Sequence, residues 1–362
     1  MLTVRPGSVA RALVALAFAL GAARAQAFET GFNQAWIGEA YGHDFTTSFD
    51  PAAIDRDLAV ARRAGASVVR LWLFEGQMKQ GVAFATPGTR ATGLVPGFLD
   101  HVEATCIAAR RAGLRIYWTG HDGNWAWPLH TRAADINFNI LNDKYGEGQS
   151  FRARALGPVL DVLARYPDTV FAYDLMNEVE GSVAKWFWSD GWTGARRFIQ
   201  AEAAFVHARF PGLAVTASAG WGTAAEDLVA GRFSGLGLDF HDIHLYNDDG
   251  VIPKAYQLRD LCWRTGMRLC VGEFGQKTQK VDDALQRKVT ARFLAAARDL
   301  GCFAALAWRL DDERPDAPSF VPCFSFLRGG AERPAMADVR AFARAHPGAS
   351  AAAWDYARFR IR

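Results

Sequence analysis

The chain repeats one short signal wherever a helix would end and a strand would begin. An arginine followed within two residues by glycine or proline precedes an apolar run at residues 63–65, 111–113, 165–167, 209–211 and 264–266. Cationic side chains are favourable at the negative C-terminal end of a helix, and glycine or proline stops it. The sequence therefore predicts a regular alternation of helices with strands.

Apolar runs with the length of buried strands lie at residues 32–37, 68–73, 115–118, 170–177, 213–215, 240–245, 269–273 and 303–308. Helical periodicity lies between them, for example where Asp50 caps a segment whose Ile54 and Leu58 share one face. These alternating units predict an α/β fold, a (β/α)8 TIM barrel, with functional residues at the C-terminal strand ends. The alternative, a doubly wound open sheet, needs a glycine-rich phosphate loop after the first strand, where residues 35–39 instead read AWIGE.

The N-terminal residues have the pattern of a secretory signal peptide. Arg5 precedes an apolar stretch at residues 9–20, and small residues then flank a cleavage point after Ala25 or Ala27. The alternative, a membrane anchor, needs about 20 apolar residues, more than this stretch contains. We therefore expect residues 1–25 to be a signal peptide and residues 26–362, which contain no linker-like tract, to be a single domain. The mature protein would be secreted or periplasmic, with no membrane partner.

Charge and cysteine content limit the partners and cofactors. The formal net charge is +3, from 41 Lys and Arg against 38 Asp and Glu, so the charge balance does not indicate nucleic-acid binding. Five cysteines leave at least one unpaired in a monomer, the state we expect. Strand periodicity turns Cys270 outward if Glu273 faces inward, so Cys262 is a candidate disulfide partner; Cys302 and Cys323 form a second candidate pair. No Cys-x-x-Cys spacing indicates a zinc site, and we expect no cofactor.

Polar or aromatic residues stand at the predicted C-terminal strand ends, in the order Arg70, His121, Asn177, Glu178, His244, Tyr246, Glu273 and Trp308. A carboxylate beside a dry interior loses hydration, so the two glutamates indicate a function. Cleavage of a glycosidic bond requires such a carboxyl pair. Over essentially the whole mature chain, this ordered set resembles glycoside hydrolase family 5, the cellulase and β-mannanase family of retaining (β/α)8 glycosidases. In that family Asn-Glu ends strand four and Glu ends strand seven.

The resemblance implies a role for each of the two glutamates. Glu273 would be the nucleophile, kept ionised by Arg70 and Tyr246. Glu178 would be the general acid and later the base, with its pKa raised by the charge of Glu273. A retaining pair of this kind lies roughly 5 to 5.5 Å apart.

The remaining strand-end residues would bind or orient the substrate. Asn177 would contact the 2-hydroxyl of the reacting sugar, His121 would bind sugar hydroxyls, and His244 would orient the acid. Trp308 would form a floor under the sugar ring, and twelve tryptophans are many for this length. We expect further indoles to line an open cleft: Trp36, Trp125 and Trp127, and after strand four Trp186, Trp188 and Trp192. Proline commonly follows the acid in this family, whereas this chain has Val179.

These features predict a secreted O-glycosyl hydrolase acting by double displacement on a β-linked polysaccharide or oligosaccharide, such as β-1,4-mannan or β-1,4-glucan. One alternative is a metal-dependent barrel hydrolase built on His121, Asp122, His241, Asp242 and His244, although His241 and His244 are poorly spaced for one strand face. Another is a carbohydrate-binding barrel without catalytic activity. An intact glutamate pair argues against this second alternative.

Overall fold

The structure is a computed structural model that describes residues 27–37, 45–46, 49–74, 81–85, 90–124, 138–184, 188, 190–311, 321–348 and 359–361. The predicted signal peptide lies outside these residues. So do Trp125, Trp127 and Trp186, whose proposed contacts with substrate remain predictions.

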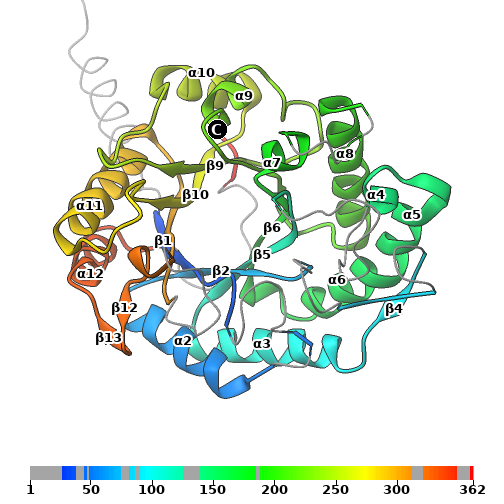
Figure 1. The fold of residues 1–362 in the computed structure, drawn as a ribbon, viewed down its shortest axis with the longest axis horizontal. Helices are drawn as coiled ribbons and strands as arrows, with labels where there is room; N and C mark the ends of the chain where they lie inside the picture. The colour runs from blue at the N-terminus through cyan, green and yellow to red at the C-terminus, as the bar shows by residue number, and fades with distance from the viewer. Residues whose placement is uncertain are drawn as a thin grey trace, which may run out of the picture.

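Parallel strands form a ring at the centre of the molecule (Figure 1). Their spatial order is β7 (Val215–Thr216), β6 (Val170–Asn177), β5 (Arg115–Asp122), β2 (Val68–Trp72), β1 (Glu29–Asn33), β11 (Ala304–Ala307), β10 (Leu269–Gly275), β9 (His241–Tyr246) and β8 (Ser218–Ala219). β7 pairs with β6 and β8 pairs with β9, and only Ala217 separates the two short strands. β7 and β8 are therefore two halves of one strand that closes the ring, and the predicted (β/α)8 barrel is confirmed.

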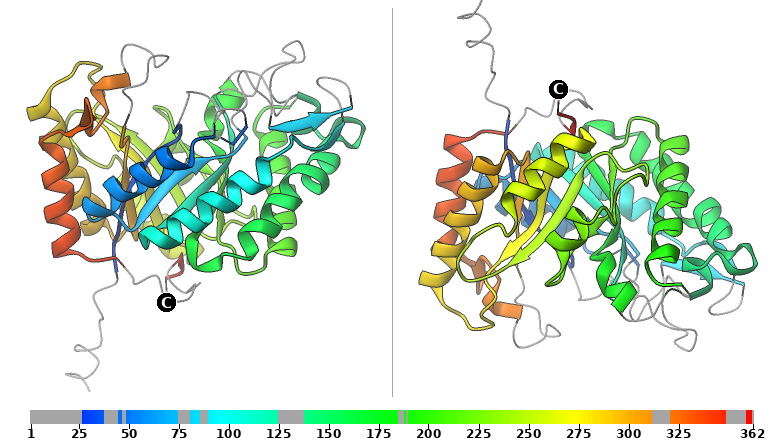
Figure 2. Two further views of the ribbon diagram at one scale, coloured as in Figure 1. Left: turned by 90° about the horizontal axis from the view of Figure 1, so that it is seen from below. Right: turned by 90° about the horizontal axis from the view of Figure 1, so that it is seen from above.

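Helices surround the ring on its outer side (Figures 1 and 2). The longer ones are α2 (Pro51–Arg63), α3 (Phe98–Ala112), α6 (Gly157–Ala164), α8 (Trp192–Arg209), α10 (Ala255–Thr265), α11 (Asp283–Leu300) and α12 (Ala335–Ala345). The shorter ones are α4 (Phe138–Leu141), α5 (Glu147–Phe151), α7 (Val179–Ala184) and α9 (Ala224–Val229). Two hairpins pair β3 (Val82–Phe84) with β4 (Ala91–Leu94) and β12 (Leu327–Arg328) with β13 (Ala331–Glu332). Short 3-10 segments at Lys144–Gly146, Pro167–Thr169 and Val321–Cys323 and a π-helical turn at Arg152–Leu156 complete the described elements. Among the described helices, none combines the length and apolar character needed to cross a membrane.

The first strand begins earlier than its apolar pattern predicts. The sequence favours residues 32–37, but β1 covers Glu29–Asn33. Its first residue is buried because the Glu29 carboxylate lies 2.6 Å from Arg115 and accepts a 2.6 Å hydrogen bond from Ser67. β1 therefore begins at a buried carboxylate that an opposite charge neutralises. Trp36 lies beyond the end of the strand.

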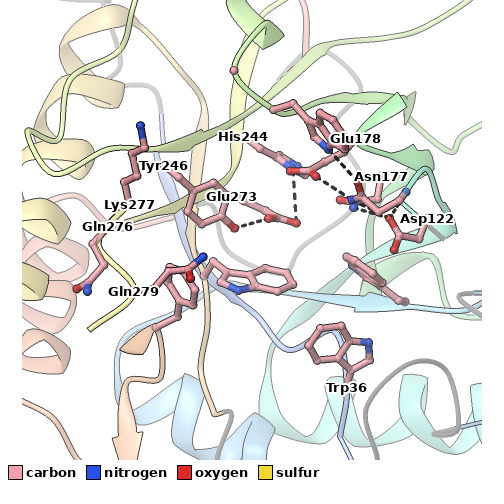
Figure 3. A pocket seen from close by; sticks show the side chains of 16 residues that line it. Trp36, Asp122, Asn177, Glu178, His244, Tyr246, Glu273, Gln276, Lys277 and Gln279 are labelled. Atoms are coloured by element: carbon pink, nitrogen blue, oxygen red, sulfur yellow. Dashed lines mark hydrogen bonds and ion pairs between the residues drawn. The ribbon is translucent and has the colours of Figure 1, made fainter. Parts of the chain in front are cut away.

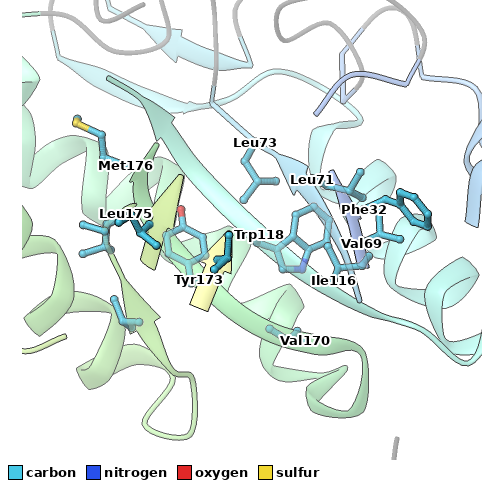
Figure 4. Packing of buried hydrophobic residues seen from close by; sticks show 14 of the residues in the cluster. Phe32, Val69, Leu71, Leu73, Ile116, Trp118, Val170, Tyr173, Leu175 and Met176 are labelled. Carbon is cyan, nitrogen blue, oxygen red and sulfur yellow. The ribbon is translucent and has the colours of Figure 1, made fainter. Parts of the chain in front are cut away.

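Apolar side chains pack on both faces of the barrel wall. On the outer face, Val69 and Leu71 of β2 and Leu73 just after it join the large core shared with the helices (Figure 4). The inner face has a smaller core that includes Val68 and Phe303. Phe359, near the chain end, completes it, with its ring centroid 5.1 Å from that of Phe303. This inner core closes the end of the barrel opposite the carboxyl ends of the strands.

The alternation of β10 shifts at Gly272, which corrects the prediction for Cys270. Val271 pairs with Ile243, but Glu273 already pairs with the next residue, His244. As a result Cys270 and Glu273 both face inward, and Cys270 packs in the inner core with Phe303. No disulfide joins any cysteines within the described part of the chain, so neither candidate pair is formed.

Gly272→Ala is expected to destabilise the protein by about 1–3 kcal/mol, the usual range for overpacking a core. A Cβ at this position would lie 2.3 Å from Asp242 Oδ1, which already accepts a 2.7 Å hydrogen bond from the Gly272 amide. Urea unfolding measures the change. Gly93→Ala is the matched control, since a Cβ there meets no atom within 4 Å. Equal stability of both variants would contradict the close packing.

Candidate active site

A cavity of about 700 Å³ opens at the carboxyl ends of the barrel strands (Figure 3). Its lining combines carboxyl groups, amides and aromatic rings: Trp36, Trp72, Asp122, Asn124, Asn177, Glu178, Trp221, Gly222, His244, Tyr246, Glu273, Gln276, Lys277, Gln279, Trp308 and Phe324. Polar groups convergent on an apolar pocket at this end of a barrel indicate a binding or active site.

Glu273 is held by one hydrogen-bond donor on each carboxylate oxygen. Arg70 donates to Oε1 at 2.6 Å, and the Tyr246 hydroxyl donates to Oε2 at 2.5 Å. Tyr246 comes from β9, which pairs with the β10 strand of Glu273, whereas Arg70 comes from β2, which β1 and β11 separate from β10. The carboxylate is thereby fixed in orientation and supplied with a positive charge, as the sequence predicts.

Arg70 is fully buried and joins the groups beneath the cavity floor. Besides Glu273, its guanidinium donates to Asp174 at 2.7 Å, to Asn177 at 2.9 Å and to Asn33 at 3.0 Å. Burial alone would lower the pKa of Arg70. The charges of Glu273 and Asp174 outweigh this effect and raise the pKa above its ordinary value. Arg70 is therefore a permanent cation that orients Asn177 as well as Glu273.

Glu178 occupies a strained backbone position at the end of β6. Its φ is +49°, in the left-handed region that non-glycine residues rarely adopt. This conformation directs the carboxyl group into the cavity, where Asn124 donates to Oε2 at 2.8 Å and His244 Nδ1 lies 3.2 Å from Oε1. Strain held in this way is characteristic of functional sites.

Both glutamates contact one ring nitrogen of His244 (Figure 3). One oxygen of Glu178, one oxygen of Glu273 and a ring nitrogen of His244 all lie within 4.8 Å of one another. Carboxylate oxygens no more than 4.8 Å apart agree better with the roughly 5 to 5.5 Å of a retaining pair than with the roughly 6.5–9.5 Å of an inverting pair. His244 Nδ1 also lies 3.5 Å from Glu273 Oε1, so it contacts both carboxyl groups.

The pKa values of this group differ from the sequence prediction. Burial would raise the pKa of Glu178, but hydrogen bonds and charge from His244 and a hydrogen bond from Asn124 lower it. Burial raises the pKa of Glu273 against the charges of His244 and Arg70. The predicted order is thus reversed, because burial outweighs the neighbouring charges at Glu273, whereas His244 and Asn124 outweigh burial at Glu178. Burial would lower the pKa of His244, but Glu273 and Glu178 raise it to about 9.

Stability is expected to fall as pH rises through this histidine's titration. The pKa of His244 is about 9 in the folded protein against 6.5 for an ordinary histidine. Its proton therefore contributes stability that is complete below pH 6.5 and is lost as pH rises through about 9. Urea unfolding across this range, with His244→Asn as the comparison, measures the effect. An NMR titration midpoint of His244 near the ordinary value would contradict it.

Tryptophans form one wall of the cavity. Trp36 lies edge-on to Trp72 and to Trp308, with ring centroids 5.9 Å apart in both pairs. The sequence predicts Trp36 and Trp308 here, and both line the cavity. Trp72 was missed, although its place two residues after inward-facing Arg70 puts it on the same face of β2.

Three predicted residues lie elsewhere. His121 faces the helices, where its Nε2 lies 3.2 Å from Glu202 of α8. The reason is that the inward and outward alternation of side chains is interrupted within β5. Tyr117 points inward to Arg70, and Asp122, five residues later, also points inward and lines the cavity. Two tryptophans after strand four are also not on the cavity: Trp188 packs on Phe198, and Trp192 packs on Phe233.

Several cavity residues were not singled out as substrate contacts from the sequence. They are Trp72, Asp122, Asn124, Trp221, Gly222, Gln276, Lys277, Gln279 and Phe324. Asn124 and Trp221 directly follow β5 and the β7–β8 strand, so strand-end position was a usable signal for both. Gln276, Lys277, Gln279 and Phe324 belong to loops after β10 and β11, whose course no local pattern predicts.

The residues of the alternative metal site do not converge. His241 points outward to Thr265 of α10 at 3.0 Å, His121 points to Glu202, and Asp242 accepts a hydrogen bond from Tyr117 inside the barrel. Glu178, His244 and Glu273 are close enough to share a metal ion. However, the buried cation of Arg70 already lies 2.6 Å from Glu273, and a metal ion bound there would be repelled by it. The donor set fits a carboxyl pair better than a metal.

Comparisons by sequence find no matching family model and no matching curated protein. Solved structures are similar in fold. Exo-β-1,4-mannosidase Op5Man5 from Opitutaceae bacterium strain TAV5 gives a TM-score of 0.66 at 15% identity, over 90% of this chain and only 60% of the Op5Man5 chain. β-Mannanase from the blue mussel Mytilus edulis gives 0.59 at 19% identity, over 84% and 94%. GH5_18 from Streptomyces cattleya in complex with GlcNAc gives 0.68 at 16% identity, over 88% and 80%. These likenesses support the barrel fold.

Proposed function

We propose that this protein is a retaining β-glycoside hydrolase of the glycoside hydrolase family 5 type, with Glu273 as nucleophile and Glu178 as acid and base. One observation carries the proposal: an oxygen of Glu178 and an oxygen of Glu273 lie within 4.8 Å of each other, and both contact the same nitrogen of His244. At that separation one carboxylate reaches the anomeric carbon while the other reaches the oxygen that leaves.

In the first step, Glu273 attacks the anomeric carbon and Glu178 protonates the departing oxygen, leaving a glycosyl ester on Glu273. In the second step, ionised Glu178 takes a proton from water. The hydroxide attacks the anomeric carbon, and Glu273 leaves as a carboxylate. Arg70 and Tyr246 stabilise that carboxylate in the free enzyme.

Glu178 and His244 together hold the proton needed for the first step. At neutral pH His244, whose pKa is raised to about 9, carries a proton, and the 3.2 Å contact allows its transfer to Glu178 Oε1. A neutral His244 also weakens the interaction that keeps Glu178 ionised. The lowered pKa of Glu178 and the raised pKa of Glu273 are therefore compatible with Glu178 as the acid.

The substrate we propose is a β-1,4-linked mannan or glucan, or an oligosaccharide of that type. The tryptophan wall of Trp36, Trp72 and Trp308 offers aromatic faces for the apolar faces of sugar rings, while amides and carboxyl groups line the rest. Two of the compared structures are by name a β-mannosidase and a β-mannanase. A carbohydrate-binding barrel without catalysis is less well supported, because it gives no reason to hold two carboxyl groups so close together.

Export is a further part of the proposal, supported by the apolar stretch at residues 9–20 and the small residues near Ala25. N-terminal sequencing of protein recovered outside the cytoplasm should begin after Ala25 or Ala27. An intact N-terminus on all recovered protein would contradict export by this signal.

The stereochemistry of hydrolysis tests the catalytic proposal. With mannotetraose or cellotetraose as substrate, proton NMR should show the β-anomer forming first. A 2-deoxy-2-fluoro glycoside of the same sugar should label the peptide that contains Glu273, detected by mass spectrometry. Initial release of the α-anomer would overturn the double-displacement mechanism, and binding of the oligosaccharides without turnover would favour a non-catalytic barrel.

A further inference from the structure

Two residues with no assigned role connect the cavity wall to Glu178. The indole N–H of Trp221 donates to Asn124 Oδ1 at 2.8 Å, and the Asn124 amide Nδ2 donates to Glu178 Oε2 at 2.8 Å. Trp221 is 47% exposed on the cavity wall, and its φ of +61° is in the left-handed region. Both ends of this connection therefore have uncommon backbone conformations, as in other strained functional sites.

The donors and acceptors determine the orientation of the Asn124 amide. An indole N–H can only donate, so the oxygen of Asn124 must face Trp221 and its NH2 group must face Glu178. Asp122 supports the same orientation, since its Oδ1 accepts from Asn124 N at 3.0 Å and from Nδ2 at 3.2 Å. A rotated amide would place its oxygen against two carboxyl groups. The amide is thus held in one of its two orientations.

Glycines allow these groups to lie so close together. A Cβ at Gly181 would lie 2.5 Å from Asn124 Oδ1 and 3.2 Å from Trp221 Nε1. A Cβ at Gly220 would lie 2.3 Å from Glu178 Cγ. The Gly220 amide donates to Glu180 at 2.8 Å, which anchors the segment that carries Trp221. Gly181 therefore packs directly against the Asn124 amide, and Gly220 packs directly against the Glu178 side chain.

We propose, on the basis of the hydrolase function proposed above, that Asn124 and Trp221 are positioning residues that confine the catalytic proton of Glu178 to Oε1. Oε2 accepts a hydrogen bond from Asn124, which favours Oε2 as the carbonyl oxygen of the protonated acid, the better acceptor of its two oxygens. The proton then occupies Oε1, the oxygen 3.2 Å from His244 Nδ1. One oxygen of the acid is thereby reserved for proton exchange with His244 and for delivery to the leaving group.

Leaving groups of different acidity test this proposal. The dinitrophenolate of a 2,4-dinitrophenyl glycoside leaves without being protonated. The leaving oxygen of a methyl glycoside or an oligosaccharide must first take a proton from the acid. Asn124→Ala and Trp221→Phe should therefore reduce kcat/KM for mannotetraose or cellotetraose by at least about tenfold, a modest share of what acid catalysis contributes. For the 2,4-dinitrophenyl β-glycoside of the same sugar, kcat/KM should stay within about twofold. Trp221→Phe keeps an aromatic ring on the cavity wall and removes only the N–H donor.

The pH profile is a second readout. Loss of the Asn124 donor removes one of the interactions that lower the pKa of Glu178, so the basic limb of kcat/KM should move to higher pH. Gly181→Ala should give the same two changes, because it displaces Asn124 without itself lining the cavity. Trp263→Phe, on the exposed face of α10, is the matched control and should change neither.

The outcomes separate this proposal from the one on which it rests. Equal losses on both classes of substrate, or no loss on either, would overturn the positioning role of Asn124 and Trp221. Glu178→Gln provides the reference, because it removes the acid itself. If Glu178→Gln shows no selective loss on substrates with poor leaving groups, the hydrolase mechanism fails instead.

Discussion

Glu273→Gln is expected to reduce kcat/KM for the true substrate by on the order of 10⁴-fold or more, since a neutral amide cannot attack the anomeric carbon. Initial rates on mannotetraose and cellotetraose measure the effect. The fold should persist, because the glutamine side chain has the same shape and replaces a buried carboxylate.

Glu226→Gln is the matched control for this substitution. Glu226 lies on α9, where its exposed carboxylate forms an ion pair with Lys254 at 3.3 Å, and we expect wild-type turnover. Retention of substantial hydrolysis by Glu273→Gln, with the ester intermediate still formed, would rule out Glu273 as the nucleophile. Near-zero turnover of both variants would point to a general effect of lost negative charge.

Arg70→Leu is expected to have the largest effect on stability, about 3–5 kcal/mol. The substitution leaves the buried carboxylates of Asp174 and Glu273 without their shared cation, from which they lie 2.7 and 2.6 Å. It also removes a positive charge that lowers the pKa of Glu273. Urea unfolding at neutral pH measures the loss, and activity should fall in parallel with the ionised fraction of Glu273.

Two comparisons sharpen the Arg70 prediction. Arg287→Leu breaks an exposed ion pair with Asp338 and should change stability only slightly, since solvent screens such pairs. Arg70→Leu combined with Asp174→Asn should be less destabilised than Arg70→Leu alone, because one of the uncompensated buried charges is removed. A double variant no more stable than the single one would show that lost packing dominates.

The (β/α)8 class and the central group of the site could be predicted from the sequence. Alternation of apolar residues along β2 and β9 was sufficient to place Arg70 inward and His244 beside Tyr246 on one face. Such predictions succeed where a strand keeps its period of two over the residues concerned. Glu178 and Glu273 were found because each ends an apolar run, a signal independent of exact phase.

Two of the failed predictions, those for His121 and Cys270, share one cause. His121 and Cys270 were assigned to the wrong face because β5 and β10 each change phase, the latter between Val271 and Glu273. A one-residue irregularity exchanges the two faces for every residue beyond it. In β10 a glycine permits the shift, but a glycine in a strand does not reveal whether the register shifts.

The sequence by itself determined the barrel, the order of its strands and the two glutamates at its mouth, because these follow from local periodicity and from residues adjacent in the chain. Only the tertiary structure decided the contacts across strands: the 4.8 Å grouping of the carboxyl groups with His244, the reversal of their expected pKa values and the link from Trp221 through Asn124 to Glu178. Charge effects and hydrogen bonds depend on distances of a few ångströms between residues far apart in sequence. Such distances exist only once the ring of strands has closed.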